Sequence, residues 1–148
     1  MSLLASAVDV CPSFAWAWVS RSYLETFYGD PKLGVEFGEV ALRLNPKDPL
    51  IFRIYLALAN PHLALGQNSE ALDSADRGLR RNASIMGFRV LKALALKRMD
   101  RLEDARKEAS ALIARHPEFR IARFLKHAGK FSHLKYSSQD LLTVGLPS

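Results

Sequence analysis

A 34-residue spacing of small residues constrains the fold of this chain more than any other feature. Ala71 and Ala75 lie on the apolar face of an expected amphipathic helix that follows a turn at Gly66. Ala105 and Ala109 repeat this pair 34 residues later, again after a short polar turn. A fixed period of this length is typical of stacked helical hairpins, in which each hairpin buries its apolar face against its neighbours. The spacing therefore predicts an all-α repeat protein.

Proline, glycine and asparagine divide the chain into helices of similar length. Asp30-Pro31 has the sequence of a helix start, because aspartate is a favoured N-cap and proline costs nothing at the first helical position. Four further starts carry a candidate side-chain cap: Ser13, Asp48, Ser84, and Asp100 in a capping box with Glu103. We expect helices at about residues 4–10, 13–28, 31–44, 50–65, 67–79, 85–98, 100–115, 118–128 and 139–144. No segment alternates apolar and polar residues with the two-residue period of a strand.

Two glycines lie four residues apart within the expected helix 31–44. Glycine inside a helix costs about 0.5–1 kcal/mol relative to alanine, so close packing has to compensate for it. We therefore expect a neighbouring backbone to approach this helix at Gly34 and Gly38.

Length and composition indicate a single domain with no covalent crosslink of its own. The chain has 148 residues, enough for a sizeable core, and its one cysteine, Cys11, cannot form an internal disulfide. No apolar run approaches the ~20 residues that a membrane-spanning helix needs. Residues 1–3 could be an added leader, and the first ten residues lack the basic start and apolar centre of a signal peptide. We expect a cytoplasmic protein.

Charge is distributed unevenly along the chain. Residues 1–76 hold 5 Lys and Arg against 9 Asp and Glu, whereas residues 77–135 hold 16 against 5. Such an asymmetry can steer an acidic partner towards the basic half. A set of solvated outer helix faces is the simpler interpretation of the same residues.

The sequence carries no arrangement of residues that indicates catalysis. It lacks a glycine-rich phosphate loop, a Gly-x-Ser-x-Gly elbow and a paired-carboxylate motif. The four histidines, His62, His116, His127 and His133, have neither the spacing nor the cysteine or carboxylate partners of a metal site. We expect no enzyme activity, no cofactor and no metal.

The repeated positions resemble the tetratricopeptide repeat (TPR), a 34-residue helix–turn–helix unit with small residues at fixed places and a closing proline. Trp18 stands at the tryptophan position of the first unit. The remaining positions are filled by Gly34, Ala71 and Ala105, then by Gly38, Ala75 and Ala109, and at the close by Pro46, Ala83 and Pro117. Ala83 departs from the pattern, and so does the 37-residue spacing from Gly34 to Ala71.

The resemblance implies hairpins stacked in a right-handed superhelix, an α-solenoid. It places three hairpins in residues 13–117, the end of a truncated preceding repeat in residues 1–12, and degenerate capping helices in residues 118–148. We therefore expect a fragment of a longer protein.

A weaker resemblance concerns that longer protein. The run His62-Leu63-Ala64-Leu65-Gly66, the basic last repeat and the final Gly-Leu-Pro look like the tails of bacterial signalling proteins that join a class III adenylate cyclase domain, or a winged-helix DNA-binding domain, to TPR arrays. It implies, as an alternative function, a non-catalytic regulatory or oligomerisation tail.

The TPR resemblance implies a protein–protein interaction scaffold that binds a peptide or protein segment in a concave groove. Carried over position by position, the groove consists of Trp16, Val19, Tyr23 and Phe27, then Arg53, Leu56, Asn60 and Leu63, and finally Val90, Leu94, Lys97 and Arg98. Aromatic residues at one end and basic residues at the other suit a segment with apolar anchors and an acidic end. The clamp that grips chaperone tails in some relatives is absent, because Val19 and Tyr23 stand where it has lysine and asparagine.

Two other interpretations of these residues stay open. Trp16 and Tyr23 could pack against a missing preceding repeat, which predicts self-association through the N-terminal face. A nucleic-acid interface would use the basic residues Arg77, Arg80, Arg81, Arg89, Lys97, Arg98, Arg101, Arg106 and Lys107, but aromatic residues are not interleaved with them. We therefore expect a protein partner.

Overall fold

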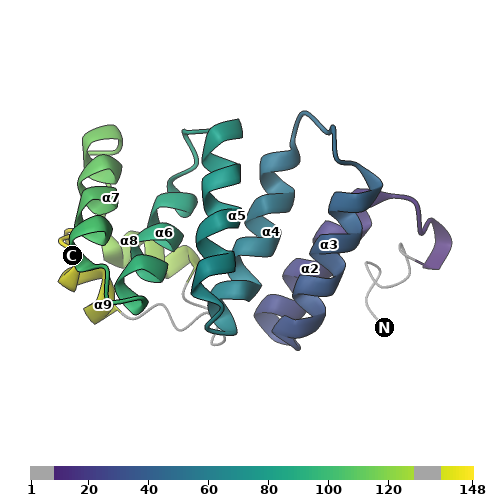
Figure 1. Cartoon of the computed structure of the whole chain (residues 1–148), viewed down its shortest axis with the longest axis horizontal. Coiled ribbons are helices and arrows are strands. Elements are labelled where there is room, and N and C mark those ends of the chain that lie inside the picture. Colours follow the sequence, from purple (N-terminus) through teal and green to yellow (C-terminus); the bar gives the residue numbers. More distant parts are fainter. Residues whose placement is uncertain (1–8, 129–137) are drawn as a thin grey trace.

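The chain folds into helical hairpins that stack side by side, as Figure 1 shows. A computed structural model describes residues 9–128 and 138–148. Its helices are α2 (Ala15–Tyr28), α3 (Pro31–Leu44), α4 (Ile51–Ala64), α5 (Asn68–Arg81), α6 (Met86–Arg98), α7 (Leu102–Arg115), α8 (Ile121–Ala128) and α9 (Ser138–Thr143). The pairs α2/α3, α4/α5 and α6/α7 form the three hairpins, and no strand occurs in the described ranges. The predicted all-α repeat fold is confirmed.

Helix positions agree closely with those expected from the sequence, but the caps differ. Asp30 caps α3 as predicted, since its Oδ1 accepts a hydrogen bond of 2.9 Å from the backbone N–H of Lys32. The caps predicted at Ser13, Asp48 and Ser84 are wrong, because Phe14, Leu50 and Ile85 occupy the N-cap positions and make no side-chain cap bond. The helix expected at residues 4–10 lies mostly outside the described residues.

The capping box predicted at Asp100 is also wrong, because Asp100 ends the preceding helix. Its φ of 58° lies in the left-handed region, and its N–H donates to the Lys97 carbonyl at 3.1 Å while the Arg101 N–H donates to the Leu96 carbonyl at 2.9 Å. This is the bond pair of a Schellman motif. Gly66, 34 residues earlier, ends α4 with the same motif and a φ of 75°. The repeat therefore requires a left-handed backbone conformation at this position, and aspartate tolerates that conformation.

Glycines in α3 allow close contact with α2 and α4. A backbone approaches at Gly34 as predicted, whereas at Gly38 the nearest atoms belong to the Leu58 and Ser22 side chains. A side chain at Gly34 would bring its Cβ to 2.5 Å from Thr26 Oγ1 and 3.2 Å from the Ser22 carbonyl. Ser22 Oγ lies 2.7 Å from the Gly34 carbonyl and 3.0 Å from the Ala57 carbonyl, so one buried hydroxyl joins α2, α3 and α4. The close approach accounts for the glycine in mid-helix.

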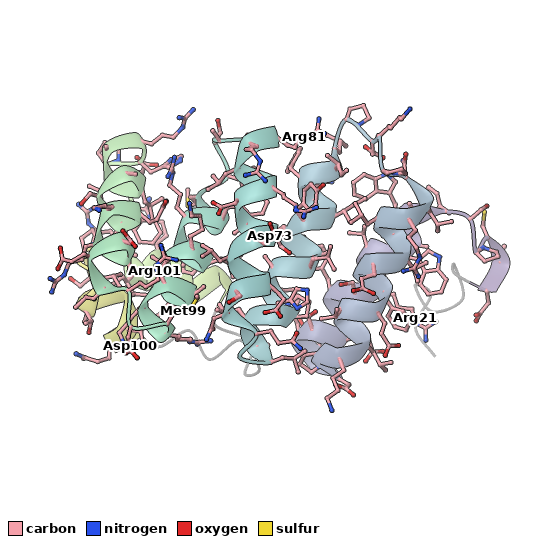
Figure 2. The ribbon with its side chains drawn as sticks, in the orientation of Figure 1. Arg21, Asp73, Arg81, Met99, Asp100 and Arg101 are labelled. Carbon is pink, nitrogen blue, oxygen red and sulfur yellow. The ribbon has the colours of Figure 1, made fainter. Side chains whose placement is uncertain are left out.

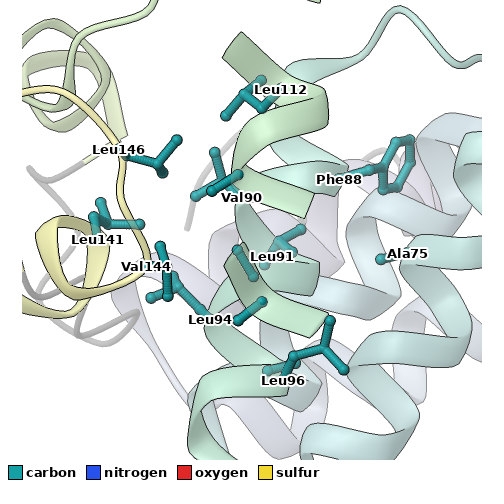
Figure 3. Close-up of a cluster of buried hydrophobic side chains, with 14 of the residues drawn as sticks. Ala75, Phe88, Val90, Leu91, Leu94, Leu96, Leu112, Leu141, Val144 and Leu146 are labelled. Atoms are coloured by element: carbon teal, nitrogen blue, oxygen red, sulfur yellow. The ribbon is translucent and has the colours of Figure 1, made fainter. Parts of the chain in front are cut away.

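The larger apolar core extends from α4 to the C-terminus and surrounds Phe88 of α6 (Figure 3). The Phe88 side chain is fully buried, and its ring packs so closely on Gly78 of α5 that even a methyl group at Gly78 would overlap it. A smaller core around Ile54 and Val19 joins the first two hairpins. The missing side chain at Gly78 thus admits the large Phe88 ring from the neighbouring helix.

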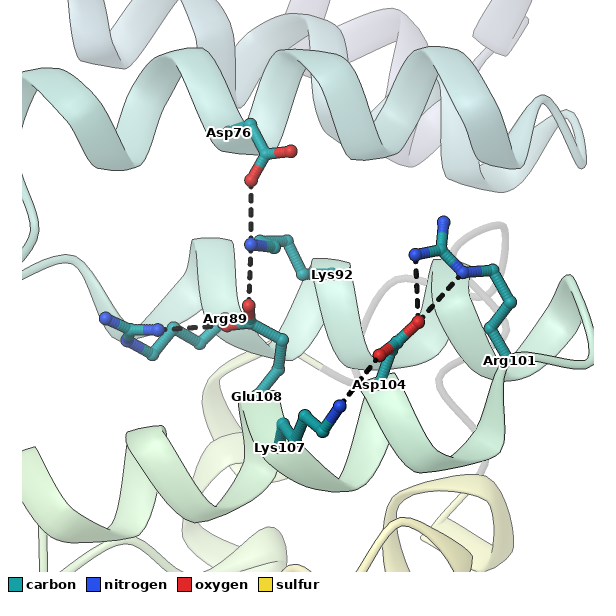
Figure 4. A network of polar contacts seen from close by, with 7 residues as sticks. All are labelled: Asp76, Arg89, Lys92, Arg101, Asp104, Lys107 and Glu108. Carbon is teal, nitrogen blue, oxygen red and sulfur yellow. Dashed lines mark hydrogen bonds and ion pairs between the residues drawn. The ribbon is translucent and has the colours of Figure 1, made fainter.

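Ion pairs connect α5, α6 and α7 across the surface of the third hairpin (Figure 4). Lys92 Nζ lies 2.7 Å from Asp76 Oδ1 and 2.6 Å from Glu108 Oε1, and Arg89 Nη1 lies 2.9 Å from Glu108 Oε2. Burial acts to lower the pKa of Lys92, but the hydrogen bonds and charges of Asp76 and Glu108 outweigh it and raise that pKa. Lys92 therefore stays charged, and the three helices are held in register.

Candidate peptide-binding groove

An open pocket of about 530 Å³ lies between α2 and α4. Its lining consists of Trp16, Val19, Ser20, Tyr23, Phe52, Arg53, Leu56 and Ile85. Five of these residues belong to the groove predicted from the sequence, and the structure brings them together from two hairpins. We call this pocket the open groove. Ser20, Phe52 and Ile85 were not predicted, because they lie outside the fixed positions carried over from the family.

Arg53 is the charged residue of the open groove. Its side chain is exposed, and its guanidinium lies 6.0 Å from the centroid of the Trp16 ring, within range of a cation–π contact. The Tyr23 hydroxyl donates a long hydrogen bond of 3.4 Å to the Arg53 carbonyl. Burial raises the pKa of Tyr23, and the nearby Arg53 charge lowers it only in part, so the hydroxyl remains a neutral donor. The groove thus has an apolar floor with one cation at its rim.

Three other predicted residues in the first two hairpins serve packing. Phe27 is half-buried and stacks on Tyr23, with ring centroids 5.7 Å apart and planes 13° apart. Asn60 is buried, and its Nδ2 donates to the Leu56 carbonyl at 2.8 Å. Leu63 is fully buried in the core, and its carbonyl accepts a hydrogen bond of 3.0 Å from Arg98 of α6. Arg98 was also predicted to line the groove, but its hydrogen bond to Leu63 joins the second hairpin to the third.

The other predicted positions of the third hairpin are covered by the chain itself. Residues 138–148, which we call the C-terminal segment, pack α9 against α6 and α8. Val90 and Leu94 are fully buried in one cluster with Leu141, Val144 and Leu146 of this segment (Figure 3). Lys97 forms an ion pair of 2.7 Å with Asp140. The open groove therefore ends before the third hairpin.

Sequence reasoning placed a helix in the C-terminal segment but did not predict what it covers. The sequence of the segment does indicate a buried face. Leu141 and Val144 are spaced to lie on one face of a short helix, with Leu146 after them and the acidic Asp140 before them. That pattern is apolar enough to need a partner surface, yet the sequence alone does not identify the partner.

Many of the basic residues considered for nucleic acid are paired with carboxylates. Within residues 9–128 and 138–148, ion pairs join Arg77 to Asp73, Arg89 to Glu108, Lys97 to Asp140, Arg101 and Lys107 to Asp104, and Arg106 to Glu103. In each pair the carboxylate offsets the charge of its basic partner locally.

Metal sites and membrane-spanning helices are both absent from residues 9–128 and 138–148. No group of three or more His, Cys, Asp or Glu side chains there could hold a metal ion. None of the helices in those residues has the length and apolarity needed to cross a membrane.

Comparisons with known proteins agree with the hairpin architecture. A family model described as "Psidin, N-terminal TPR repeats region" matches residues 54–127, which is half of the chain. The solved structure described as "Crystal structure of MamA" has a TM-score of 0.71 and 14% sequence identity, and the match covers 95% of this chain and 84% of that chain. At this identity the likeness shows the fold alone. No curated protein matches the sequence.

Proposed function

Because the chain belongs to the tetratricopeptide-repeat family, we propose that its open groove binds a segment of a partner protein through apolar side chains and one acidic group. The repeats support a protein-interaction scaffold. The proposal adds the place of binding and the chemistry of the bound segment.

The observation that carries the proposal is the composition of the open groove. Seven of its eight lining residues are uncharged, and the eighth, Arg53, is exposed and forms no ion pair within the described residues. A planar guanidinium can bind a carboxylate through two parallel hydrogen bonds. Trp16, Tyr23 and Phe52 offer rigid apolar surface for a bulky side chain next to that carboxylate. An extended or helical segment with an apolar residue near an aspartate or glutamate fits both features.

Other sequence-based expectations stay predictions. Self-association through the N-terminal face and a cytoplasmic location belong to this group. Neither the groove nor the matches support the alternative of a regulatory tail of an adenylate cyclase-like enzyme.

Selection from a random peptide library displayed on phage tests the groove. We expect the immobilised chain to enrich peptides that combine apolar residues with aspartate or glutamate. Arg53→Glu and Tyr23→Ala should each weaken the selected peptides by about 2 kcal/mol, roughly thirtyfold in Kd, as for central anchors of an interface. Trp16 can report binding by fluorescence in a Trp18→Phe background, because the chain has two tryptophans.

The matched control is Arg43→Glu, which makes the same charge change on an exposed side chain of α3 outside the pocket. It should leave the affinity unchanged. Peptides that bind both groove variants as tightly as the wild-type chain would refute the proposed site.

A further inference from the structure

We propose that a second pocket, formed by Tyr55 of α4 and by Asp73, Arg77, Arg80 and Arg81 of α5, binds an oxyanion carried by a segment of a protein partner. The pocket has a volume of about 520 Å³ and shares no lining residue with the open groove. We call it the arginine pocket; Figure 2 labels Asp73 and Arg81 of this pocket along α5. The proposal stands independently of the proposed function of the open groove.

The last turns of α5 bring the three arginines together. Arg77, Arg80 and Arg81 are spaced three and four residues apart, and such residues lie next to each other on a helix surface. Tyr55 contributes a half-buried ring and a hydroxyl from the neighbouring helix. Three guanidinium groups and one phenol thus converge on one concave surface.

Charge in this pocket is left uncompensated. Asp73 is engaged by Arg77, whose Nε lies 2.8 Å from Asp73 Oδ2. Arg80 and Arg81 are exposed, and neither forms an ion pair or hydrogen bond within the described residues. Arg77 lies three and four residues before Arg80 and Arg81, a spacing at which like charges destabilise a helix, and the negative end of the α5 dipole offsets only part of that cost.

In the first half of α7, by contrast, exposed basic side chains form ion pairs with carboxylates of the same helix. Arg106 and Lys107 lie on the surface as Arg80 and Arg81 do, but each pairs with a carboxylate three residues before it, at 3.1 Å and 3.3 Å. Arg80 and Arg81, adjacent at the end of α5, have no such carboxylate, and an anionic ligand would supply the missing partner.

The donors define the chemistry of that ligand. Guanidinium groups bind phosphate and carboxylate oxygens with paired hydrogen bonds, and the Tyr55 hydroxyl, which has no hydrogen-bond partner within the described residues, adds another donor. A phosphorylated side chain and a pair of neighbouring carboxylates both present several oxygens at this scale. The Asp73 carboxylate in the wall disfavours a continuous polyanion such as nucleic acid, which favours a local charge on a protein segment.

Fluorescence anisotropy with the full chain tests this site. Three labelled peptides of otherwise identical sequence serve as probes: one with phosphoserine, one with two adjacent glutamates and one with serine. We expect the first two peptides to bind and the third not to bind. The ratio of the Kd values of the phosphoserine and glutamate peptides identifies the source of the oxyanion. The double variant Arg80→Gln/Arg81→Gln should weaken binding by about tenfold or more, as expected for lost charge-assisted hydrogen bonds.

The double variant Arg106→Gln/Lys107→Gln removes the same charge from exposed positions on α7 and should bind like the wild-type chain. Arg53→Glu should also leave this binding unchanged, so failure here is distinguishable from failure of the open groove. Circular dichroism of each variant checks that the helices remain folded. The proposal is overturned if the anionic peptides do not bind, if both double variants lose affinity equally, or if single-stranded RNA binds more tightly and through the same two arginines.

Discussion

Replacing Phe88 by alanine is expected to lower the free energy of unfolding by about 3–5 kcal/mol, the range for truncating a fully buried phenylalanine. The Phe88 side chain has no exposed surface, and its ring fills the space above Gly78. Alanine would leave a cavity between α5 and α6 that the close-packed helices can only partly fill. Urea denaturation followed by circular dichroism measures the change.

Phe14→Ala is the matched control, since this phenylalanine is 52% exposed. We expect it to change the free energy of unfolding by no more than about 0.5 kcal/mol. Equal effects at the two positions would contradict the packing of the second hairpin on the third.

Leu141→Asp is expected to release the C-terminal segment from α6. Leu141 is fully buried, and a carboxylate there would lose its hydration without gaining a partner. The free energy of unfolding should fall by at least about 2 kcal/mol, the lower end for truncating a buried leucine. Release also uncovers Val90 and Leu94, so the fluorescence of an added apolar dye should rise.

Leu142→Asp provides the control one residue further along the same helix. Leu142 is 45% exposed, so aspartate there keeps its hydration and should alter neither stability nor dye binding beyond about 0.5 kcal/mol. If Leu141→Asp behaved like this control, the C-terminal segment would not be packed on the groove face of the third hairpin.

The helical hairpins could be predicted from the sequence because the repeat restricts each position in the same way three times. Ala71 and Ala105 mark the same close contact 34 residues apart, and Asp30-Pro31 marks a helix start by local chemistry alone. Caps were harder to predict, because a polar residue beside a helix can end one helix as well as begin the next. Asp100 shows this: its left-handed backbone closes α6, a role that Gly66 performs in the preceding unit.

The candidate site could be predicted only in part. The family positions gave Trp16, Tyr23 and Arg53, which face the open groove because α2 and α4 keep the regular hairpin geometry. They did not show that the C-terminal segment lies over Val90 and Leu94, since that contact joins residues about 50 positions apart in the sequence and depends on tertiary packing. The family positions also did not predict the arginine pocket, because its residues on α5 and Tyr55 of α4 lie outside the groove positions.

Site-directed crosslinking tests the central claim, which is that a partner segment binds in the open groove. In a Cys11→Ser background the chain has no other cysteine, so a photoreactive benzophenone can be attached at one chosen position. Ser20→Cys places it in the open groove, and Ser110→Cys places it on an exposed part of α7. We predict that a peptide selected by the wild-type chain crosslinks from position 20 and not from position 110. Crosslinking from position 110 alone, or equally from both positions, would contradict the assignment of the groove.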